Sequence, residues 1–425
     1  MRRSSVLGLA VSCLTAALGL AGCSTAGSGA ARGRGGMDPA AGARPASLDL
    51  TAAEVDALAD RPDILLRVRS DPYAYFRLLA SSFSRRVCAE FDGLIDEMPL
   101  VNLHGDAHLE QYAITPTAHG LDDFDEAGMG PGVVDLVRFA SSIHFACRRA
   151  AFDCDPEAAV DEFLDAYAEG LANPESAVTT PAWVARERRR TPTDREAFLR
   201  WAESLMEPPD PRTRTQMMER WALFVRLMTQ LRPDAPDDYY GVERFGAIDI
   251  GVGSALDAKF LLRIRGDTAD PLDDVIVEIK PMNEVEAPCL LRPPSGGMLM
   301  TLLPTARMGR LKPVVLGYLP WEEGGEDVSR WWIHSWDLGY RELAIGDLTS
   351  QEDLAAIARD IGLQLGRGHV NGIAAPLEEL NRLAQARTFG LTRNRVEFLA
   401  RRLADEVYQG WVRQMSSPGT ASGGP

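Results

Sequence analysis

The stretch from residue 101 to residue 135 gathers acidic and imidazole side chains into one turn-rich region with apolar segments on both sides. Its ionisable residues include His104, Asp106, His108, Asp122, Asp123, Asp125, Glu126 and Asp135. A folded chain does not place so many such groups in an apolar core, because each buried charge needs a partner or a metal. We therefore predict that this stretch lies at the mouth of a packed core and forms a metal-assisted or acid–base site.

Charge and lysine usage narrow the classes of function. The 425 residues carry a formal net charge of −16, which argues against nucleic acid as a partner. Only three of the 45 basic residues are lysines: Lys259, Lys280 and Lys312. A lysine beside other candidate residues is therefore more informative here than in most sequences.

The N-terminus resembles a bacterial lipoprotein signal. Residues 1–23 have a basic start, an apolar run and a closing LAGC that ends at Cys23. The run is too short and wrongly flanked for a membrane-spanning helix. We expect lipidation of Cys23, a membrane anchor in the cell envelope outside the cytoplasm, and a flexible tether over residues 24–47. The alternative is a translation start at Met37, which gives a cytoplasmic protein.

Four further cysteines remain: Cys88, Cys147, Cys154 and Cys289. Cys147 and Cys154 could pair in an oxidising compartment, and the sequence leaves that open. We expect no disulfide framework and no zinc site, because the four are scattered and lack a CxxC spacing.

Patterning divides the rest of the chain into a helical lobe and a β-rich lobe. Residues 48–235 and 340–415 have helical periodicity, and residues 236–339 hold strand-like runs separated by turns. One long amphipathic helix is expected over 71–91, and Trp201 is expected in the core. Residues 416–425 are disordered by composition. The whole of 48–415 is expected to form one domain.

The segment HGDAH offers an acid–base group. Asp106 could accept a proton from an attacking hydroxyl, with His104 and His108 on either side of it. Further on, Asp123 and Asp125 supply carboxylates of the kind that Mg²⁺ prefers. Asp135, near the start of a helix, is expected to support the site.

The β-rich lobe offers groups that suit phosphate. A glycine turn that contains Gly251, Gly253 and Ser254 follows one strand, and Lys280 ends a later apolar strand, VIVEIK. Neither feature is specific alone, because a single lysine at a strand end often just reaches solvent. In this order they favour a phosphate-binding β-lobe.

These motifs resemble known families. HGDAHLEQY followed by DDFDEAGMGPGVVDL is similar to the HGDxHxxN and DFxxxGxGPxxxDL motifs of aminoglycoside phosphotransferase-like and choline kinase-like proteins. More closely, roughly residues 50 to 375 resemble the bacterial family called domain of unknown function 2252. The segments that carry this similarity, in order, are DPYAYFRLL (71–79), GVGSALDA (251–258), EIKPM (278–282), WIHSW (332–336) and LGRGHVNG (365–372).

The resemblance implies an α+β fold of the protein-kinase type, circularly permuted, with a mainly helical C-lobe and a small antiparallel β-lobe. It makes Asp106 the catalytic base and Asp123 a metal ligand, with Lys280 and the glycine turn on nucleotide phosphates. The chain departs from the family at four places: Gln111 replaces the metal-binding Asn, and Leu256, Pro281 and His334 replace a Gly, a Glu and an Arg. Gln111 can still offer an oxygen to the metal, one methylene further out.

We therefore predict a Mg²⁺-dependent phosphotransferase that acts on an unidentified small molecule or protein, with ATP or another phosphoryl donor. One alternative is a membrane-tethered relative that binds a ligand without catalysis. Another is a metal hydrolase built on His104, Asp106, His108 and Asp123, since alternate residues of an extended segment share a face. Substrate, donor and oligomeric state do not follow from the sequence.

Overall fold

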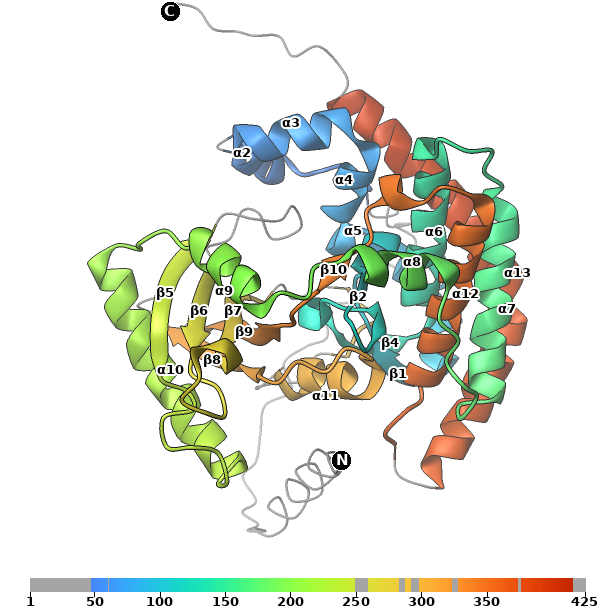
Figure 1. Cartoon of the computed structure of the whole chain (residues 1–425). Coiled ribbons are helices and arrows are strands. Elements are labelled where there is room, and N and C mark those ends of the chain that lie inside the picture. Colours follow the sequence, from blue (N-terminus) through green and yellow to red (C-terminus); the bar gives the residue numbers. More distant parts are fainter. Residues whose placement is uncertain are drawn as a thin grey trace, which may run out of the picture.

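The computed structural model describes residues 47–59, 61–248, 259–282, 287–291, 298–322, 328–373 and 376–415. Figure 1 shows long helices and two small sheets on one side and a five-stranded sheet on the other. The predicted α+β class is confirmed, while the permuted kinase-like topology stays a prediction. The predicted signal, tether, glycine turn and C-terminal tail lie outside the described residues.

Four short helices open the described chain: α2 (Ala52–Ala59), α3 (Pro62–Ser70), α4 (Pro72–Arg77) and α5 (Ala80–Glu90). The single helix expected over 71–91 is wrong, because the chain leaves the helix between α4 and α5. The carbonyl oxygens of Phe76 and Arg77 accept hydrogen bonds from the buried guanidinium of Arg138, at 3.1 and 3.4 Å. A tertiary contact therefore takes the place of helix continuation at this point.

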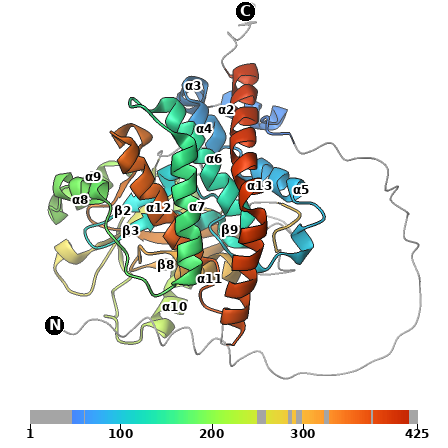
Figure 2. The ribbon, with the colours of Figure 1, turned by 90° about the vertical axis from the view of Figure 1, so that its right-hand side faces the viewer.

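Four longer helices form the main core: α6 (Val133–Arg149), α7 (Pro156–Ala172), α12 (Gln351–Gly368) and α13 (Leu377–Gln414). Figure 2 shows α7 and α13 side by side in front of α6 and α12. Helices α7 and α12 pack backbone to backbone, since a Cβ at Gly362 would lie 2.3 Å from the carbonyl oxygen of Phe163. Helix α6 is buried along most of its length, including the charged residues Asp135 and Arg138.

Short strands and turns shape the chain between α5 and α6. Strands β1 (Leu100–Leu103) and β4 (Gly128–Pro131) form one antiparallel pair. Strands β2 (Tyr112–Ile114), β3 (His119–Leu121) and β10 (Arg341–Glu342) form a three-stranded sheet. The 3-10 turns in the described residues are η1 (Ile95–Glu97), η2 (Leu109–Gln111), η3 (Phe124–Glu126), η4 (Pro271–Asp273) and η5 (Ile345–Asp347). The acidic stretch singled out above therefore consists of tight turns held between short strands.

The five-stranded sheet is antiparallel in the order β5-β6-β7-β9-β8. Its strands are β5 (Val242–Ile248), β6 (Lys259–Ile264), β7 (Val275–Pro281), β8 (Leu316–Glu322) and β9 (Val328–Trp336). Helix α10 (Pro211–Leu231) covers one face through Trp221 and Phe224, and α9 (Arg195–Ser204) packs on the other through Leu199 and Ala202. The sequence pattern predicted that both helices belong to the helical lobe. Helices α8 (Ala182–Arg190) and α11 (Met298–Met308) complete the described elements.

Alternation along the strands decides which side chains leave the core. Val277 and Ile279 of β7 pack toward α10, so Glu278 and Lys280 point to the opposite face of the sheet. His334 and Trp336 of β9 point the same way, because Ile333 packs toward α10. This face carries polar and aromatic groups where it meets the acidic turns.

Two core predictions need correction. Trp201 of α9 is 51% exposed, because its ring lies beyond the edge of the core that Leu199 and Ala202 enter. All four cysteines between α5 and the segment 287–291 are paired, as Cys147–Cys154 and Cys88–Cys289, so the expectation of no disulfide framework is wrong. The second pair joins residues 201 positions apart, which spacing along the chain cannot reveal.

In the described part of the chain, no helix is both long and apolar enough to span a bilayer.

Candidate active site

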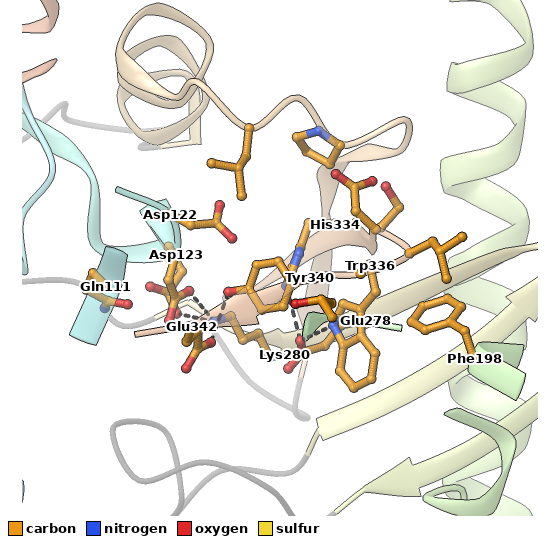
Figure 3. A pocket seen from close by; sticks show the side chains of 18 of the residues that line it. Gln111, Asp122, Asp123, Phe198, Glu278, Lys280, His334, Trp336, Tyr340 and Glu342 are labelled. Atoms are coloured by element: carbon orange, nitrogen blue, oxygen red, sulfur yellow. Dashed lines mark hydrogen bonds and ion pairs between the residues drawn. The ribbon is translucent and has the colours of Figure 1, made fainter. Parts of the chain in front are cut away.

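A cavity of about 580 Å³ lies where the acidic turns meet the polar face of the five-stranded sheet. Figure 3 shows Gln111, Asp122 and Asp123 at one end, Phe198 and Trp336 at the other, and Lys280 between them. Its lining comes from the turns around η2 and η3, from β7 and β9, from α9 and from the segment that leads into β10. Segments far apart in the sequence therefore share one cavity.

Buried hydrogen bonds fix the loop that presents Asp106. The carboxylate of Asp135, fully buried at the start of α6, accepts from the backbone N–H of His104 at 2.7 Å and of Gly105 at 3.0 Å. Gly105 has φ +90°, and a Cβ there would lie 2.0 Å from the carbonyl oxygen of Glu126. Only glycine fits this turn, so the loop is locked against η3. Asp135 thus has the supporting place expected from the sequence.

Two cationic or potentially cationic groups hold the Asp106 side chain. Arg138, one turn further along α6 from Asp135, donates through Nε to Asp106 Oδ1 at 2.8 Å, and its guanidinium stacks 3.9 Å from the centre of the Phe76 ring. His108 Nε2 lies 3.3 Å from Asp106 Oδ2. Burial alone would raise the pKa of Asp106, but the charge of Arg138 and the contact with His108 lower that pKa below its ordinary range. Asp106 is therefore an ionised carboxylate at the cavity wall.

The two histidines of HGDAH do not face one point. His104 Nε2 lies 2.8 Å from the carbonyl oxygen of Asp122 and so donates to it, while the His108 ring sits between Asp106 and the hydroxyl of Tyr73. Both imidazoles are fully buried, and neither lines the cavity. Burial lowers the pKa of His108. This geometry does not support the hydrolase alternative, which requires two imidazoles on one metal.

Lys280 meets Asp123, the residue before η3, and Asp125 within η3, although Lys280 and Asp123 are 157 positions apart in the sequence. Lys280 Nζ forms an ion pair with Asp123 Oδ1 and lies 3.0 Å from Asp125 Oδ2. Lys280 is 4% exposed, so its charge is matched inside the protein. Among the described non-glycine residues, only Asp123 has a positive φ, at 59°. A strained backbone of this kind persists only where the surroundings hold it, which is common at functional sites.

Burial and the neighbouring Asp123 raise the pKa of Asp125 to about 7. Burial would also raise the pKa of Asp123, but the Lys280 ammonium outweighs it and lowers that pKa. Both carboxylates raise the pKa of Lys280 well above its ordinary value, against the effect of burial. The single ammonium group of Lys280 thus stabilises the ionised form of Asp123, and Asp125 holds a proton near neutral pH.

The predicted metal ligands Asp123, Asp125 and Gln111 all line this cavity. Carboxylate and carboxamide oxygens are the donors that Mg²⁺ prefers, and Lys280 places a positive charge beside the two carboxylates. Among the residues that the structure describes, no group of three or more His, Cys, Asp and Glu is arranged to hold a metal ion. These two carboxylates and one amide are donors of the type that magnesium takes, and they do not form a full protein cage.

A second polar group lies on the sheet beside Lys280. Glu278 Oε2 accepts from His334 Nε2 at 3.1 Å and from Trp336 Nε1 at 2.8 Å. Burial would raise the pKa of Glu278, but the hydrogen bond and charge of His334 bring it to about 2. The same contact raises the pKa of His334. His334, known from the sequence only as a departure from the family, is therefore part of an ion pair in the cavity.

Aromatic side chains form the outer end of the cavity. The rings of Trp201 and Trp336 are stacked with centroids 5.7 Å apart, and Phe198 lies 6.0 Å from Trp201. An exposed tryptophan in a concave site is a common ligand contact. Periodicity did not predict the exposure of Trp201, because a helix that packs on a sheet with one side only has the same periodicity as a fully buried one.

Three further basic residues belong to the site without having been predicted as site residues. Arg77 and Lys259 line the cavity, and Arg138 reaches Asp106 from behind it. Strand alternation could have indicated Glu278, two positions before Lys280, and the helical turn between Asp135 and Arg138 could have indicated Arg138. Gly251, Gly253 and Ser254 lie outside the described residues, as does Cys23.

The fold and the site together define a mixed α+β protein with an acidic, lysine-containing cavity between helical turns and an antiparallel sheet. Residues 64–240 match the model of a family described as an uncharacterized protein conserved in bacteria, domain of unknown function 2252. This match confirms the resemblance for that segment, which contains Asp106, Asp123 and Asp125 but ends before Lys280. No curated protein and no solved structure matches the chain significantly.

Proposed function

We propose that the protein is a magnesium-dependent phosphotransferase that transfers a phosphoryl group to a hydroxyl of a small molecule or protein. The observation that carries this proposal is the meeting of Lys280 with Asp123 and Asp125 in the cavity that Asp106 also lines. Phosphoryl transfer depends mainly on positioning and charge stabilisation, so a lysine, metal-binding carboxylates and a carboxylate for the hydroxyl are the groups it needs.

The excess of negative charge in the cavity supports a bound cation. Nine lining residues are acidic: Asp106, Asp122, Asp123, Asp125, Glu126, Asp194, Glu278, Asp337 and Glu342. Only Arg77, Lys259 and Lys280 in the lining are permanent cations. Burial and neighbouring acids raise the pKa of Asp337 to about 6, and they raise the pKa of Glu126 well above its ordinary value. Asp123, Asp125 and Gln111 would hold the magnesium ion, which would neutralise charge on the transferred group.

Asp106 would position the acceptor hydroxyl. Arg138 and His108 keep its carboxylate ionised, so it can accept a hydrogen bond from that hydroxyl at neutral pH. A carboxylate with a lowered pKa is a weak base, and so the proton would move late, once the hydroxyl oxygen has become acidic by bonding to phosphorus. Lys280 would leave Asp123 for the phosphate oxygens when the ion and donor enter.

The cellular compartment of the protein decides which phosphoryl donors could reach it. Two disulfides support an oxidising environment, which agrees with the lipoprotein-like N-terminus and with export to the cell envelope. Cytosolic ATP does not reach that compartment. The donor would then be another phosphoryl compound, and a start at Met37 would restore ATP as the candidate.

The first test is ligand-dependent stability of the protein from Leu48 onward, measured as a thermal shift with Mg²⁺ and a panel of nucleotides and inorganic polyphosphates. We expect a shift with at least one of them, because a ligand that binds only the native state raises apparent stability. A correctly folded protein that shows no shift with any of these compounds would contradict the proposal.

Asp106→Asn is the matching catalytic test. We expect it to abolish phosphoryl transfer and to leave donor binding within a few-fold of the wild type, since it removes the acceptor's contact and not the donor's. Transfer at the wild-type rate would contradict the role of Asp106.

A second candidate is a binding protein without catalysis. Lys280 already contacts both Asp123 and Asp125, so it must leave these partners before it can act on a substrate. This candidate predicts ligand binding that survives Asp106→Asn, together with no turnover by the wild-type protein.

A further inference from the structure

We propose that Lys259 and Lys280 together bind two adjacent phosphoryl groups of one ligand, so that the donor carries a diphosphate or longer phosphate chain. This inference rests on the proposed function and deepens it. It assigns a role to Lys259, which no motif indicates, and it names the part of the donor that the protein recognises.

Strand register places the two lysines side by side. Strands β6 and β7 are antiparallel neighbours, and Phe260 pairs with Ile279. The next position in this register sets Lys259 beside Lys280. Phe260 and Ile279 both pack toward α10, so the lysines both point to the opposite face, where both line the cavity. Side chains directly opposite on neighbouring strands start about 5 Å apart at Cβ.

Two buried ammonium groups this close are unfavourable unless negative charge lies between or around them. Lys259 is 7% exposed and Lys280 4%. The protein's own compensation is carboxylate: Lys280 contacts Asp123 and Asp125, and the charge of Lys259 lowers the pKa of Asp123 and of Glu278 after the larger effects of Lys280 and His334. Asp123 and Asp125 are the carboxylates that a metal ion would take, so Lys280 would turn to an anion that enters with the metal, beside Lys259.

The size of the anion follows from the geometry. Two phosphoryl groups joined by one oxygen can meet one ammonium each, and the orthophosphate arm of the test below decides whether a single phosphate is enough. The chemistry of the residue supports this reading as well. A chain with 45 basic residues uses lysine only three times, and two of the three line this cavity. Lysine binds phosphate as a compact point charge, where arginine would need room for a planar fork.

The small number of lysines makes a direct test possible on the full-length wild-type protein. Each lysine is labelled with an amine-acylating reagent and quantified by peptide mass spectrometry, with Mg²⁺ and inorganic orthophosphate, pyrophosphate or tripolyphosphate. We expect pyrophosphate or tripolyphosphate to slow labelling of both Lys259 and Lys280 at least five-fold. Lys312, exposed and bonded to the carbonyl oxygen of Ala306, serves as the internal reference and should not change.

The outcomes separate this inference from the proposed function. Protection of Lys280 without Lys259 would overturn the two-lysine site and leave the phosphotransferase proposal standing. Protection of neither lysine by any of the three anions would overturn the two-lysine site, and the thermal-shift panel with nucleotides would then decide the phosphotransferase proposal by itself. Protection of both by orthophosphate to the same degree as by pyrophosphate would overturn the diphosphate requirement.

Calorimetric titration of variants gives an independent measure. Lys259→Met keeps the length of the side chain, and we expect it to weaken pyrophosphate binding at least ten-fold while orthophosphate binding changes less than two-fold. Lys312→Met is the matched control and should bind both anions as the wild type does. Equal pyrophosphate affinity of Lys259→Met and wild type would overturn the inference.

Discussion

At the scale of single residues, the cavity places more carboxylates together than its cations can stabilise. Asp125 shows the consequence most clearly, because it is 6% exposed and shares Lys280 with Asp123. Burial and Asp123 raise its pKa from 3.8 to about 7. A carboxyl group with a raised folded-state pKa favours folding while it is protonated.

We therefore predict that Asp125 lowers the stability of the ligand-free protein as pH rises. Its contribution is fully present below about pH 4, falls between about pH 4 and 7, and is lost above that range. A pKa unit corresponds to about 1.4 kcal/mol, so the effect amounts to a few kcal/mol. Melting curves of wild type and Asp125→Asn should diverge above pH 5, with the variant more stable at pH 8.

The exposed Asp56→Asn on α2 is the control and should follow the wild type throughout. A constant difference between Asp125→Asn and wild type from pH 4 to pH 8 would show that Asp125 does not titrate in this way.

At the scale of elements, helix α6 positions the residues around Asp106. Its first turn supplies Asp135 for the HGDAH backbone, and the next supplies Arg138 for the side chain of Asp106 and the carbonyls that end α4. One helix therefore fixes both the position and the charge state of the predicted base. His369, at the end of α12, contacts the same Asp135 carboxylate at 3.2 Å.

We predict that Arg138→Met destabilises the protein by about 3–5 kcal/mol, because it leaves a buried carboxylate without its main partner. Urea denaturation measures this cost. Adding Asp106→Asn should recover part of it, since the double variant no longer buries an unmatched charge. Arg148→Met is the control on the same helix: its pair with Asp405 is exposed, and its loss should cost about 1 kcal/mol or less. Additive effects of the two cavity substitutions would mean that the pair is not coupled.

Periodicity and capping signals predict most of the elements, because they are local. The residues Thr51-Ala-Ala-Glu54 form a capping box, with the N–H of Thr51 donating to Glu54 at 2.6 Å. The side chain of Asp194 caps α9 by accepting from the N–H of Ala197. The break between α4 and α5 depends on Arg138, and the exposure of Trp201 depends on how α9 packs on one face of the five-stranded sheet. Contacts of that kind leave no trace in local patterning.

For the candidate site too, the sequence revealed the local motifs but not the contacts between distant residues. The motifs pointed to Asp106, Asp123, Asp125 and Lys280, and these do line one cavity. They did not indicate that Arg138 holds Asp106, or that Lys259 faces the same space. The roles of His104 and His108 beside Asp106 could not be separated by spacing, since alternate residues share a face only in an extended strand, and this segment is a turn.

At the scale of the whole molecule, two disulfides close loops of very different length. Cys88–Cys289 spans 201 residues and Cys147–Cys154 spans 7. In the chain-entropy account, these loops stabilise the fold by about 5 and about 2.5 kcal/mol respectively. The longer one also joins α5 to the segment that follows β7.

We predict that replacing Cys88 and Cys289 by serine costs about twice as much unfolding free energy as replacing Cys147 and Cys154. Denaturant unfolding of the two double variants beside the wild type measures this difference. Peptide mapping of the native protein isolated from cells should recover both disulfide-linked peptides. Free thiols at all four positions in that material would argue for a reducing compartment and for Met37 as the start.

The longer disulfide also limits how far the cavity can open. Strand β7 ends at Pro281, and Cys289 lies eight residues further on, fastened to α5. Even a fully extended chain of that length spans less than about 30 Å, so the strand that carries Lys280 cannot swing far from the helices. A reductant would break the Cys88–Cys289 disulfide and remove this limit, although neither cysteine lines the cavity. In the proposed phosphotransferase, ligand entry and release in the oxidised protein would then depend on small motions of a pre-assembled pocket, and turnover would respond to thiols as well as to substrate.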